Sequence, residues 1–310
     1  MSNRTDVLVL GGTGVDTLVR VPQLPLPFAD SYMVPAIEAE AGQTGDGVAV
    51  GLRSLGLGVH LLDFIGDDPE GLLVRALHER HGVEFTALIT AAGTKRAVNL
   101  IDKAGRRLSL YDYTRSDPAD RFDEALLARL AAGARHAHVS ITHPCQYALP
   151  TLRAAGLTIS TDLHNWDGRN AYHLDFADQA DVVFLSRTAL PDHEAAMRLI
   201  LDRGRAGVVV VTDGEHGGYV LDRADGRIVA YPPATPPSPA IDSNGAGDAF
   251  VAGYLYGMLA GEPVERCVQF GAVAGAHACT GTRTEVVPID PDTLRARSSV
   301  DTCDGRGLGA

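Results

Sequence analysis

The chain has 310 residues, of which 45% are hydrophobic and 21% charged, and its formal net charge is −12. This composition is typical of a globular protein with a large core, and the length allows one large α/β domain or two smaller ones. The acidic balance, without any basic stripe along the chain, argues against a nucleic-acid partner, and the lack of a Gly-Lys pair excludes a Walker-type P-loop.

The sequence also excludes a membrane-spanning or disulfide-rich protein. The longest apolar runs, such as Val7–Leu10 and Val208–Val211, are far too short to cross a bilayer. The N-terminus lacks the apolar stretch of a secretory signal, so we expect a cytoplasmic protein without a membrane partner. The cysteines show no C-x-x-C spacing, and we assign neither a disulfide nor a zinc site; Cys267 and Cys279 fall in apolar helical patterns that predict small buried thiols.

Short apolar runs alternate with helical patterns along most of the chain. We expect strands at Val7–Leu10, Val59–Ile65, Ala137–Ile141, Leu157–Thr161, Val182–Leu185 and Val208–Thr212. Helices are expected at Val48–Leu55, Pro69–His81, Asp123–Ala132, Cys145–Ala155 and Ala189–Arg203. Continuous apolar strands separated by helices predict an α/β fold with a mostly parallel central sheet covered on both faces.

Three segments depart from this alternation. Residues 15–40 are rich in proline, and residues 95–113 alternate around a turn at Lys103–Gly105, which predicts an exposed antiparallel hairpin. Strands that leave a parallel sheet suggest a lid that excludes water, although a surface hairpin without function fits the pattern equally well. The polar, glycine-rich segment 295–310 is expected to be a frayed or peripheral C-terminal tail.

The most informative stretch is residues 241–261, IDSNGAGDAFVAGYLYGMLAG. Apolar residues at helical spacing predict a buried helix that begins near Gly245. Its entrance, residues 244–248, presents small residues and backbone N–H groups at the positive end of a helix, which is an arrangement that binds phosphate. Capping by Ser243 or Asn244 would explain the acidic residue but not the glycines, each of which costs about 1 kcal/mol inside a helix.

Residues 242–248, DSNGAGD, resemble the D-[TS]-x-G-A-G-D signature of the ribokinase (PfkB-type) family of carbohydrate kinases. The likeness covers roughly residues 5–290 and includes, in order, GGTGVD at 11–16, AGQTGDGVA at 41–49, FIGDD at 64–68 and TDGEHG at 212–217. Several ordered motifs are far more specific than one. The resemblance implies a three-layer α/β/α sandwich over residues 1–294, with a small β lid from about 15–40 and 95–113.

The resemblance implies ATP-dependent phosphorylation of a hydroxyl on a small sugar or polyol. Asp248 would be the catalytic base, and the amides of Gly245, Ala246 and Gly247 would form an anion hole for the transferring phosphoryl group. A carboxylate at a helix N-terminus is held ionised, which suits a base. Magnesium is expected with the ATP, because it neutralises phosphate charge, but we assign no residue of the chain as a metal ligand.

Substrate contacts are implied at several positions. Asp16 matches the family's hydroxyl-binding aspartate, and Gly42 and Gln43 lie in its glycine-rich substrate segment. The family's asparagine in that segment falls on Asp46, or on Gly47 when counted from Leu55 and Gly56; we prefer Asp46, because a carboxylate can accept two hydroxyl hydrogen bonds. Capping of the next helix by Asp46 is an equal alternative. Further candidates are Asn99 in the hairpin, and Thr142, His143 and His164 at strand ends.

Nucleotide contacts are implied at Asp162, Ser186, Thr212, Gly214, Gly217, Asn244 and His277, the last in the adenine pocket. The family's Asn-x-x-Glu motif, which supports the magnesium–water network, is absent: the matching place reads Ser186-Arg187-Thr188-Ala189. The surroundings of the magnesium ion must therefore differ from the family's pattern.

Other functions fit the sequence less well. Asn244 resembles adenosine-kinase-like members, which makes a nucleoside kinase the main alternative. The missing Asn-x-x-Glu motif leaves open a catalytically silent, ligand-binding relative. An NAD-binding protein is disfavoured, because Thr17 stands where the glycine pattern after the first strand needs a glycine. Family members often dimerise through the lid, and the apolar residues of 97–113 permit a homodimer of that kind.

Overall fold

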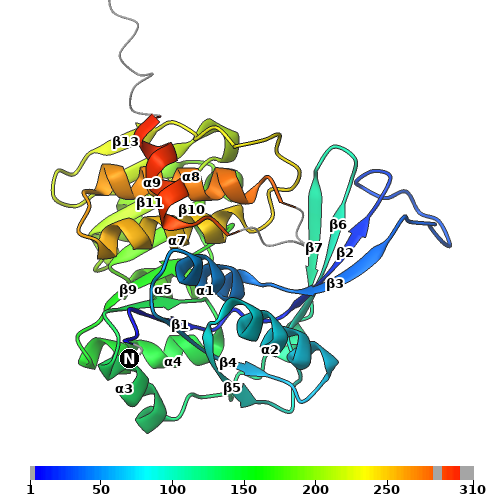
Figure 1. The fold of residues 1–310 in the computed structure, drawn as a ribbon, viewed down its shortest axis with the longest axis horizontal. Coiled ribbons are helices and arrows are strands. Elements are labelled where there is room, and N and C mark those ends of the chain that lie inside the picture. The colour runs from blue at the N-terminus through cyan, green and yellow to red at the C-terminus, as the bar shows by residue number, and fades with distance from the viewer. Residues whose placement is uncertain (1–3, 282–287, 301–310) are drawn as a thin grey trace, which may run out of the picture.

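The computed structural model describes residues 4–281 and 288–300. Within these ranges, nine strands form one large sheet and four form a smaller sheet that projects from one side of it (Figure 1). The large sheet has the spatial order β13 (Ile228–Tyr231), β12 (Gly218–Asp222), β11 (Val208–Thr212), β10 (Val182–Ser186), β9 (Thr158–Asp162), β8 (His136–Val139), β1 (Val7–Leu10), β4 (Val59–Ile65) and β5 (Glu84–Ile89).

The large sheet is mostly parallel, as predicted. All neighbouring pairs from β11 to β5 are parallel, whereas β12 and β13 pair antiparallel at one edge. The six predicted strands lie within one or two residues of β1, β4, β8, β9, β10 and β11. The sequence pattern missed β5, β12 and β13; β5 is an edge strand without a fully buried residue, so it lacks the continuous apolar run on which the prediction depended.

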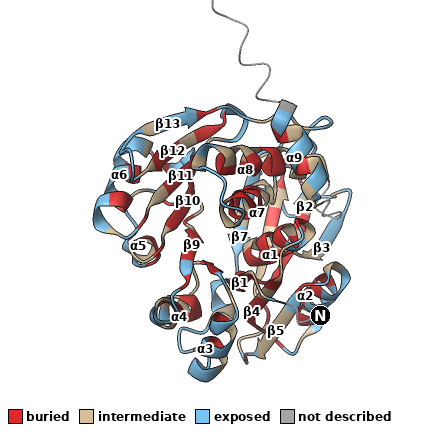
Figure 2. Cartoon of the chain, turned by 60° about the vertical axis from the view of Figure 1, so that its left-hand side comes forward, coloured by how far each residue is buried: buried red, intermediate tan, exposed pale blue. Residues whose placement is uncertain are grey.

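Helices cover both faces of this sheet, which makes three layers. One core cluster joins the sheet to α3 (Glu124–Ala132), α4 (His143–Ala154), α5 (Ala171–Ala177) and α6 (His193–Arg203). A second cluster on the other face includes residues of α1 (Thr44–Ser54), α2 (Pro69–His81), α7 (Ala246–Leu259), α8 (Val264–Ala278) and α9 (Pro291–Val300). Buried residues line the strands between the two helix layers (Figure 2). The predicted fold class is therefore confirmed.

The small sheet has the order β3 (Ile37–Ala41), β2 (Val15–Arg20), β6 (Arg96–Ile101) and β7 (Arg107–Tyr111), and we call it the lid. The β6–β7 pair is antiparallel, with Leu100 opposite Leu108, which confirms the predicted hairpin. The proline-rich segment contributes β2 and β3, which the sequence pattern did not show as strands. Because β2 pairs with β6, the two irregular segments form one sheet. In Figure 1 the lid extends away from the body on the right.

Residues 295–310 were predicted to be frayed or peripheral, and as far as residue 300 the structure contradicts fraying. Residues 291–300 form α9, with Leu294 and the Ser298 side chain fully buried. The Ser298 carbonyl accepts hydrogen bonds from Arg266 Nη1 at 2.8 Å and Gln269 Nε2 at 2.6 Å. Anchoring by a few residues outweighs the polar composition. The rest of the predicted tail, residues 301–310, lies outside the described residues.

Two further predictions concern cysteines and membranes. Cys267 is buried, as predicted, whereas Cys279 is only partly buried. Cys145 is also buried, within α4. In the part of the chain that the structure describes, we find no helix with the length and apolarity of a membrane span.

Two buried histidines on β8 tie stability to pH. Burial lowers the pKa of His136 to about 3 and that of His138 to about 4. Both rings accept or donate hydrogen bonds with hydroxyls of β9: His136 Nε2 lies 2.8 Å from Ser160 Oγ, and His138 Nδ1 lies 2.9 Å from the same atom. Both histidines are therefore neutral in the folded chain at neutral pH.

We predict that these histidines make the protein acid-labile. Below about pH 6.5 the unfolded chain binds protons that the folded chain rejects, so each histidine should cost about 1.4 kcal/mol of stability per pH unit until pH approaches its folded pKa. Urea unfolding between pH 7 and 5 measures the slope. His136→Gln and His138→Gln should each reduce it, whereas His216→Gln, at a side chain that is 72% exposed, should not. Unchanged slopes in both core variants would contradict this account.

Candidate functional site

The candidate site predicted from the sequence lies around the N-terminus of α7. Gly245 precedes the helix in the left-handed region at φ +79°, and Asp248 lies in the first turn. A Cβ added at Gly245 or Gly247 would meet no atom within 4 Å, so both glycines border open space. The Ala246 N–H donates to the Ser243 carbonyl at 3.2 Å. Among the described residues we find no acceptor for the amides of Gly245 and Gly247, which are therefore the better anion donors of the three.

Asp248 lies directly against the N-terminal part of α1. A Cβ added at Gly47 would lie 2.7 Å from Asp248 Oδ2 and 2.9 Å from Asp248 Cβ. The Gly45 N–H donates to the Gly12 carbonyl at 2.8 Å, and the Gly42 N–H donates to the Gly14 carbonyl at 3.1 Å. The glycine-rich segment before α1 is therefore joined both to the turn after β1 and to the predicted base. Only a residue without a side chain at position 47 permits this approach.

Three predicted substrate contacts converge beside this segment. Asp16 on β2 is only 5% exposed, and its Oδ2 accepts from Asn99 Nδ2 of β6 at 2.7 Å. Its Oδ1 accepts from Gln43 Nε2 at 3.2 Å. Ser109 Oγ of β7 donates to Asn99 Oδ1 at 2.6 Å. A carboxylate, two amides and a hydroxyl thus form one polar cluster that spans the lid and the body, which is the chemistry that recognises sugar hydroxyls.

Asp46 has the capping role and not the preferred substrate role. Its side chain is fully buried, and its Oδ2 accepts from the N–H groups of Gln43 at 3.0 Å and Gly14 at 3.1 Å. Its Oδ1 lies 2.7 Å from His78 Nε2 of α2. Because the side chain is 0% exposed, the carboxylate offers no surface to a sugar. Capping and burial of the carboxylate, rather than sugar binding, explain the residue.

We predict that Asp46→Ala destabilises the fold by about 3 kcal/mol, because buried His78 and two amides lose their partner. Denaturant unfolding measures this loss. Asp123→Ala provides a matched control, since Asp123 caps the exposed start of α3 through Leu126 N at 2.7 Å and should cost only about 1 kcal/mol. A variant with unchanged stability and weakened sugar binding would restore the substrate role to Asp46.

Asp162 is the last residue of β9, and His164 follows two positions later. The charge of Asp248, the predicted base, acts on the His164 ring. His164 Nδ1 lies 3.4 Å from Asp162 Oδ2, and the His164 backbone adopts φ +51°, which places the ring beyond the strand end. Burial alone would lower the pKa of His164, but Asp162 and, less strongly, Asp248 raise it above its usual value. Burial would raise the pKa of Asp162, but His164 holds it below its usual value. The charges of Asp162 and Asp248 therefore both act on the His164 ring and favour its protonated form.

The turn that is predicted to meet the nucleotide, residues 212–217, comes directly after β11 and lies next to the end of β10. Ser186 and Thr212 are paired residues at the ends of β10 and β11, and the turn after Thr212 contains Gly214 at φ +57° and Gly217 at φ +83°. Positive φ angles at both positions favour glycine. The short 3-10 helix Arg187–Ala189 lies at the position of the family's Asn-x-x-Glu motif. Arg187 Nη1 donates to Asp213 Oδ2 at 2.5 Å. An arginine–aspartate ion pair therefore lies where the resemblance would place the Asn-x-x-Glu motif.

Backbone contacts join the segment that contains Asn244 to the end of α8, which contains His277. Backbone N–H groups of Ile241 and Asp242 donate to the Cys279 carbonyl, at 2.8 and 3.2 Å, which brings the last turn of α8 and His277 beside the segment before α7. Burial lowers the pKa of His277. Asn244 Oδ1 accepts from Arg107 Nη1 of the lid at 2.7 Å. Sequence reasoning missed Arg107, because nothing in a hairpin pattern indicates which side chain crosses to the body.

Thr142 and His143 lie at the start of α4 and are less closely joined to the cluster. Thr142 Oγ1 donates to Cys145 Sγ at 3.1 Å, and a Cβ added at Gly11 would lie 3.0 Å from Thr142 Oγ1. Thr142 is therefore beside the end of β1. The His143 ring instead packs edge-on against Tyr172, with centroids 5.3 Å apart. An aromatic contact of this kind explains the histidine without a ligand.

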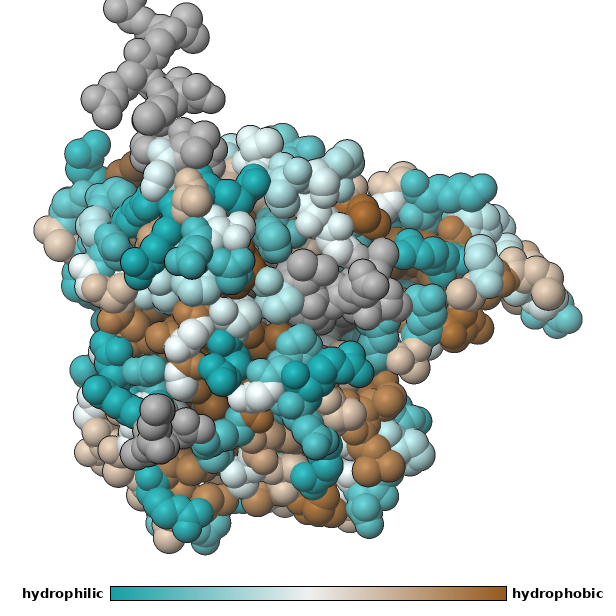
Figure 3. Space-filling view, viewed as in Figure 1, coloured by the Kyte–Doolittle hydropathy of each residue, from teal (hydrophilic) through white to brown (hydrophobic). Residues whose placement is uncertain are grey.

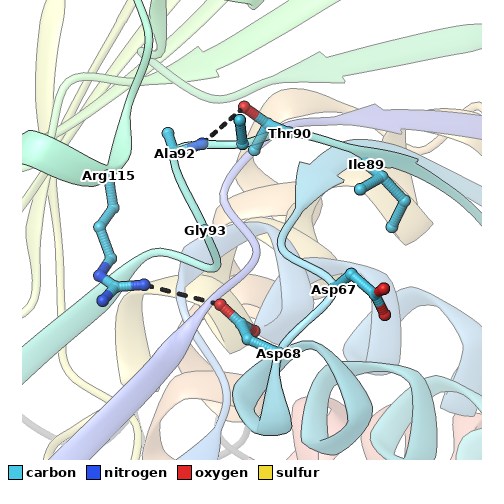
Figure 4. Close-up of a pocket in the computed structure, with 8 residues that line it drawn as sticks. Asp67, Asp68, Ile89, Thr90, Ala92, Gly93 and Arg115 are labelled. Carbon is cyan, nitrogen blue, oxygen red and sulfur yellow. Dashed lines mark hydrogen bonds and ion pairs between the residues drawn. The ribbon is translucent and has the colours of Figure 1, made fainter.

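A pocket of about 530 Å³ lies at the foot of the lid (Figure 4). It is lined by Asp67, Asp68, Ile89, Thr90, Ala91, Ala92, Gly93 and Arg115. Arg115 Nη1 lies 3.6 Å from Asp68 Oδ2, and both side chains point toward the same space in Figure 4. None of the predicted site residues lines this pocket, so it is separate from the site around Asp248.

The described residues contain no group of three or more His, Cys, Asp or Glu side chains placed to hold a metal ion. The site residues therefore do not fit a resident metal on their own. A magnesium ion would arrive bound to nucleotide phosphates, as part of the substrate.

Comparison with known proteins gives consistent results. The model of the pfkB family of carbohydrate kinases matches residues 167–289. An acarbose 7(IV)-phosphotransferase from an Actinoplanes species is 58% identical over 294 residues, which are 95% of this chain and 98% of that protein. The solved structure of a microbiome-derived acarbose kinase superposes with a TM-score of 0.89 at 43% identity, over 96% of this chain and 99% of that one. Arabidopsis thaliana ribokinase, complexed with ribose and ATP, shares the fold with a TM-score of 0.77 at 17% identity, over 95% and 98% of the two chains.

Proposed function

Because the chain belongs to the pfkB family of carbohydrate kinases and is an ATP-dependent sugar kinase, we propose that it phosphorylates acarbose or a closely similar oligosaccharide-like compound, with Asp248 as the base. The 58% identity with the acarbose phosphotransferase supports this acceptor class. The observation that best supports the mechanism is the contact between Asp248 and Gly47. Gly47 lies one turn along α1 from Gln43, which belongs to the polar cluster with Asp16 and Asn99.

In this proposal the polar cluster orients one hydroxyl of the acceptor toward Asp248. Asp16 accepts hydrogen bonds from acceptor hydroxyls, while the amides of Asn99 and Gln43 donate and accept beside it. Asp248 takes the hydroxyl proton as the oxygen attacks the γ-phosphorus of ATP in line, and ADP leaves with the former bridging oxygen. The amides of Gly245 and Gly247 donate to the oxygens of the transferring group, and positioning and electrostatics supply most of the acceleration.

MgATP is proposed to lie along the carboxyl ends of β9, β10 and β11. The Thr212–Gly217 turn would meet the nucleotide, with Ser186 and Asp162 beside the phosphates and His277 near the adenine ring. The pair of Arg187 and Asp213 supports this placement, because it fixes a guanidinium next to the turn where the Asn-x-x-Glu motif is missing. Closure of the lid over the acceptor would then exclude water from the reacting phosphate.

The lid also supports a proposed homodimer. Large apolar and aromatic side chains on it are exposed, among them Ile37, Leu108, Leu110 and Tyr111. Hydrophobic atoms lie among hydrophilic ones on the lid at the right of Figure 3. Apolar surface of this kind is typical of interaction sites, and a second copy of the chain is the partner that the family resemblance implies. The homodimer stays a prediction.

The function is tested by ATP consumption with magnesium across acarbose, maltooligosaccharides, ribose, fructose and nucleosides. We expect turnover on acarbose or a close analogue and none on adenosine, cytidine or inosine. Turnover on nucleosides alone would favour the nucleoside-kinase alternative that Asn244 suggested. ATP binding without turnover on any acceptor would favour a silent relative. Turnover that Asp248→Asn does not reduce would overturn the proposed mechanism.

A further inference from the structure

A buried ion pair lies where the lid joins the body. Asp63, near the carboxyl end of β4, is fully buried, and its Oδ2 lies 2.9 Å from Nζ of Lys95, the residue directly before β6. Lys95 Nζ also donates to the Phe64 carbonyl at 3.2 Å. The same Asp63 Oδ2 accepts hydrogen bonds from the Thr13 backbone N–H at 2.9 Å and the Thr13 hydroxyl at 2.7 Å. One carboxylate of the body therefore holds residues beside the starts of two lid strands.

The two residues that Asp63 holds are next to each other at the base of the lid. Thr13 precedes β2 by two positions, and Lys95 directly precedes β6. The Val15 N–H, at the start of β2, donates to the Lys95 carbonyl at 2.9 Å. A Cβ added at Gly14 would lie 2.7 Å from the same carbonyl oxygen, so the two chains approach closely. The lid strands converge where they meet the body (Figure 1). The bases of β2 and β6 are therefore joined to each other and to Asp63.

Separation of this junction would cost free energy. Asp63 Oδ1 is buried, and none of the residues that the structure describes donates a hydrogen bond to it. The carboxylate therefore depends on the groups at Oδ2. Movement of Lys95 away from it would leave a desolvated charge without this counter-ion, which is strongly unfavourable even where the intact pair contributes little. We therefore expect the lid to move in its outer parts and not at the bases of β2 and β6.

The polar cluster that is proposed to bind the acceptor lies just beyond these bases. Asp16 follows Thr13 by three positions, and Asn99 follows Lys95 by four. The two strands pair in parallel, and Asn99 Nδ2 donates to Asp16 Oδ2 at 2.7 Å. A shift of either base would displace this carboxylate and amide relative to Asp248 on α7. Small displacements of groups that orient a substrate have large kinetic effects.

We propose that Asp63 and Lys95 are positioning residues for the acceptor: their ion pair fixes the bases of β2 and β6 and thereby the place of the polar cluster on these strands. In this proposal neither residue touches the acceptor or the nucleotide. The pair resists separation at the junction, while the outer hairpin stays free to close over the acceptor. The inference rests on the proposed kinase function, because that function supplies the acceptor.

Hydrogen exchange tests the anchor without any need for turnover. Lys95→Met keeps an unbranched side chain at the junction and removes its charge. We expect the backbone amides of residues 14–20 and 96–101 to exchange at least about tenfold faster in this variant, and those of β10 and β11 to be unchanged. Arg153→Met is the matched control, because it removes an arginine that is paired with Asp181 at 2.6 Å within the body. It should leave exchange in the lid unchanged.

Steady-state kinetics tests the consequence for the acceptor. We expect Lys95→Met to raise the acceptor KM about tenfold and to lower kcat about threefold, with the affinity for the magnesium complex of the unreactive ATP analogue AMP-PNP within about twofold. Lys95→Arg keeps the charge and should recover most of the loss. The double variant of Asp63→Asn with Lys95→Met leaves no uncompensated buried charge. It should lose no more than Lys95→Met alone, because the two residues act as one pair. Arg153→Met should leave both constants within about twofold.

The outcomes separate the anchor from the kinase function. Unchanged exchange in residues 14–20 and 96–101, or equal acceleration in the lid and in β10 and β11, would overturn the inference. Acceptor constants within about twofold of the unmutated chain, or additive losses in the double variant, would also overturn it and leave the kinase function intact. If the unmutated chain phosphorylates no acceptor, the proposed function is wrong, and the acceptor role of the anchor is wrong with it.

Discussion

Asp248→Asn is expected to lower kcat by about a thousandfold and to leave the affinity for ATP within about threefold. The substitution keeps the size of the side chain and its place in the first turn of α7, but an amide cannot accept the proton of the acceptor hydroxyl. ATP should still bind, because the Gly245 and Gly247 amides and the Thr212–Gly217 turn are unchanged. Initial rates of ADP release and calorimetric titration with AMP-PNP measure the two quantities separately.

Asp292→Asn is the matched control for this variant. Asp292 is also an aspartate in the first turn of a helix, α9, and its side chain is exposed. Its replacement should leave kcat within about twofold. Loss of activity in both variants would indicate a general effect of helix charge. Retention of more than a tenth of kcat by Asp248→Asn would mean that another group accepts the proton.

Gly47→Ala is expected to lower kcat by about a hundredfold without unfolding the protein. The added methyl would lie 2.7 Å from Asp248 Oδ2 and 2.9 Å from its Cβ, so the carboxylate must rotate away or α1 and α7 must separate by a few tenths of an ångström. Misplacement of a reacting group on this scale has large kinetic effects. Helical stability should not suffer, since alanine favours a helix over glycine by about 1 kcal/mol.

Gly51→Ala tests whether the effect is specific to Asp248. Gly51 lies one turn further along α1, and a Cβ there would meet only Ala252 Cβ of α7, at 2.8 Å. Its replacement perturbs the same helix pair without contacting the base, so we expect a change in unfolding free energy and kcat within about threefold. Equal loss of kcat in both variants would show that helix spacing, and not contact with Asp248, decides activity.

The sequence by itself determined the fold class, the parallel strands and the start of the helix that follows Gly245. Continuous β-branched runs such as Val208–Thr212 predict buried strands, and the spacing of apolar residues after Gly245 predicts a helix that begins there, and the structure has both. These features depend on neighbours along the chain, so a local pattern contains them. The resemblance of residues 242–248 to the kinase signature identified the chemistry, and the relatives agree with it.

Contacts between distant segments were decided only by the tertiary structure. Asp46 fits a substrate contact and a helix cap equally well in the sequence, and only the positions of His78 and Gly14 assign it to the cap. The edge strand β5 and the helix α9 lack a clear pattern, because an edge or a few anchoring residues suffice to hold them. Arg107 meets Asn244 across 137 positions, and such a meeting depends on how the lid sits against the body, which no local spacing of residues encodes.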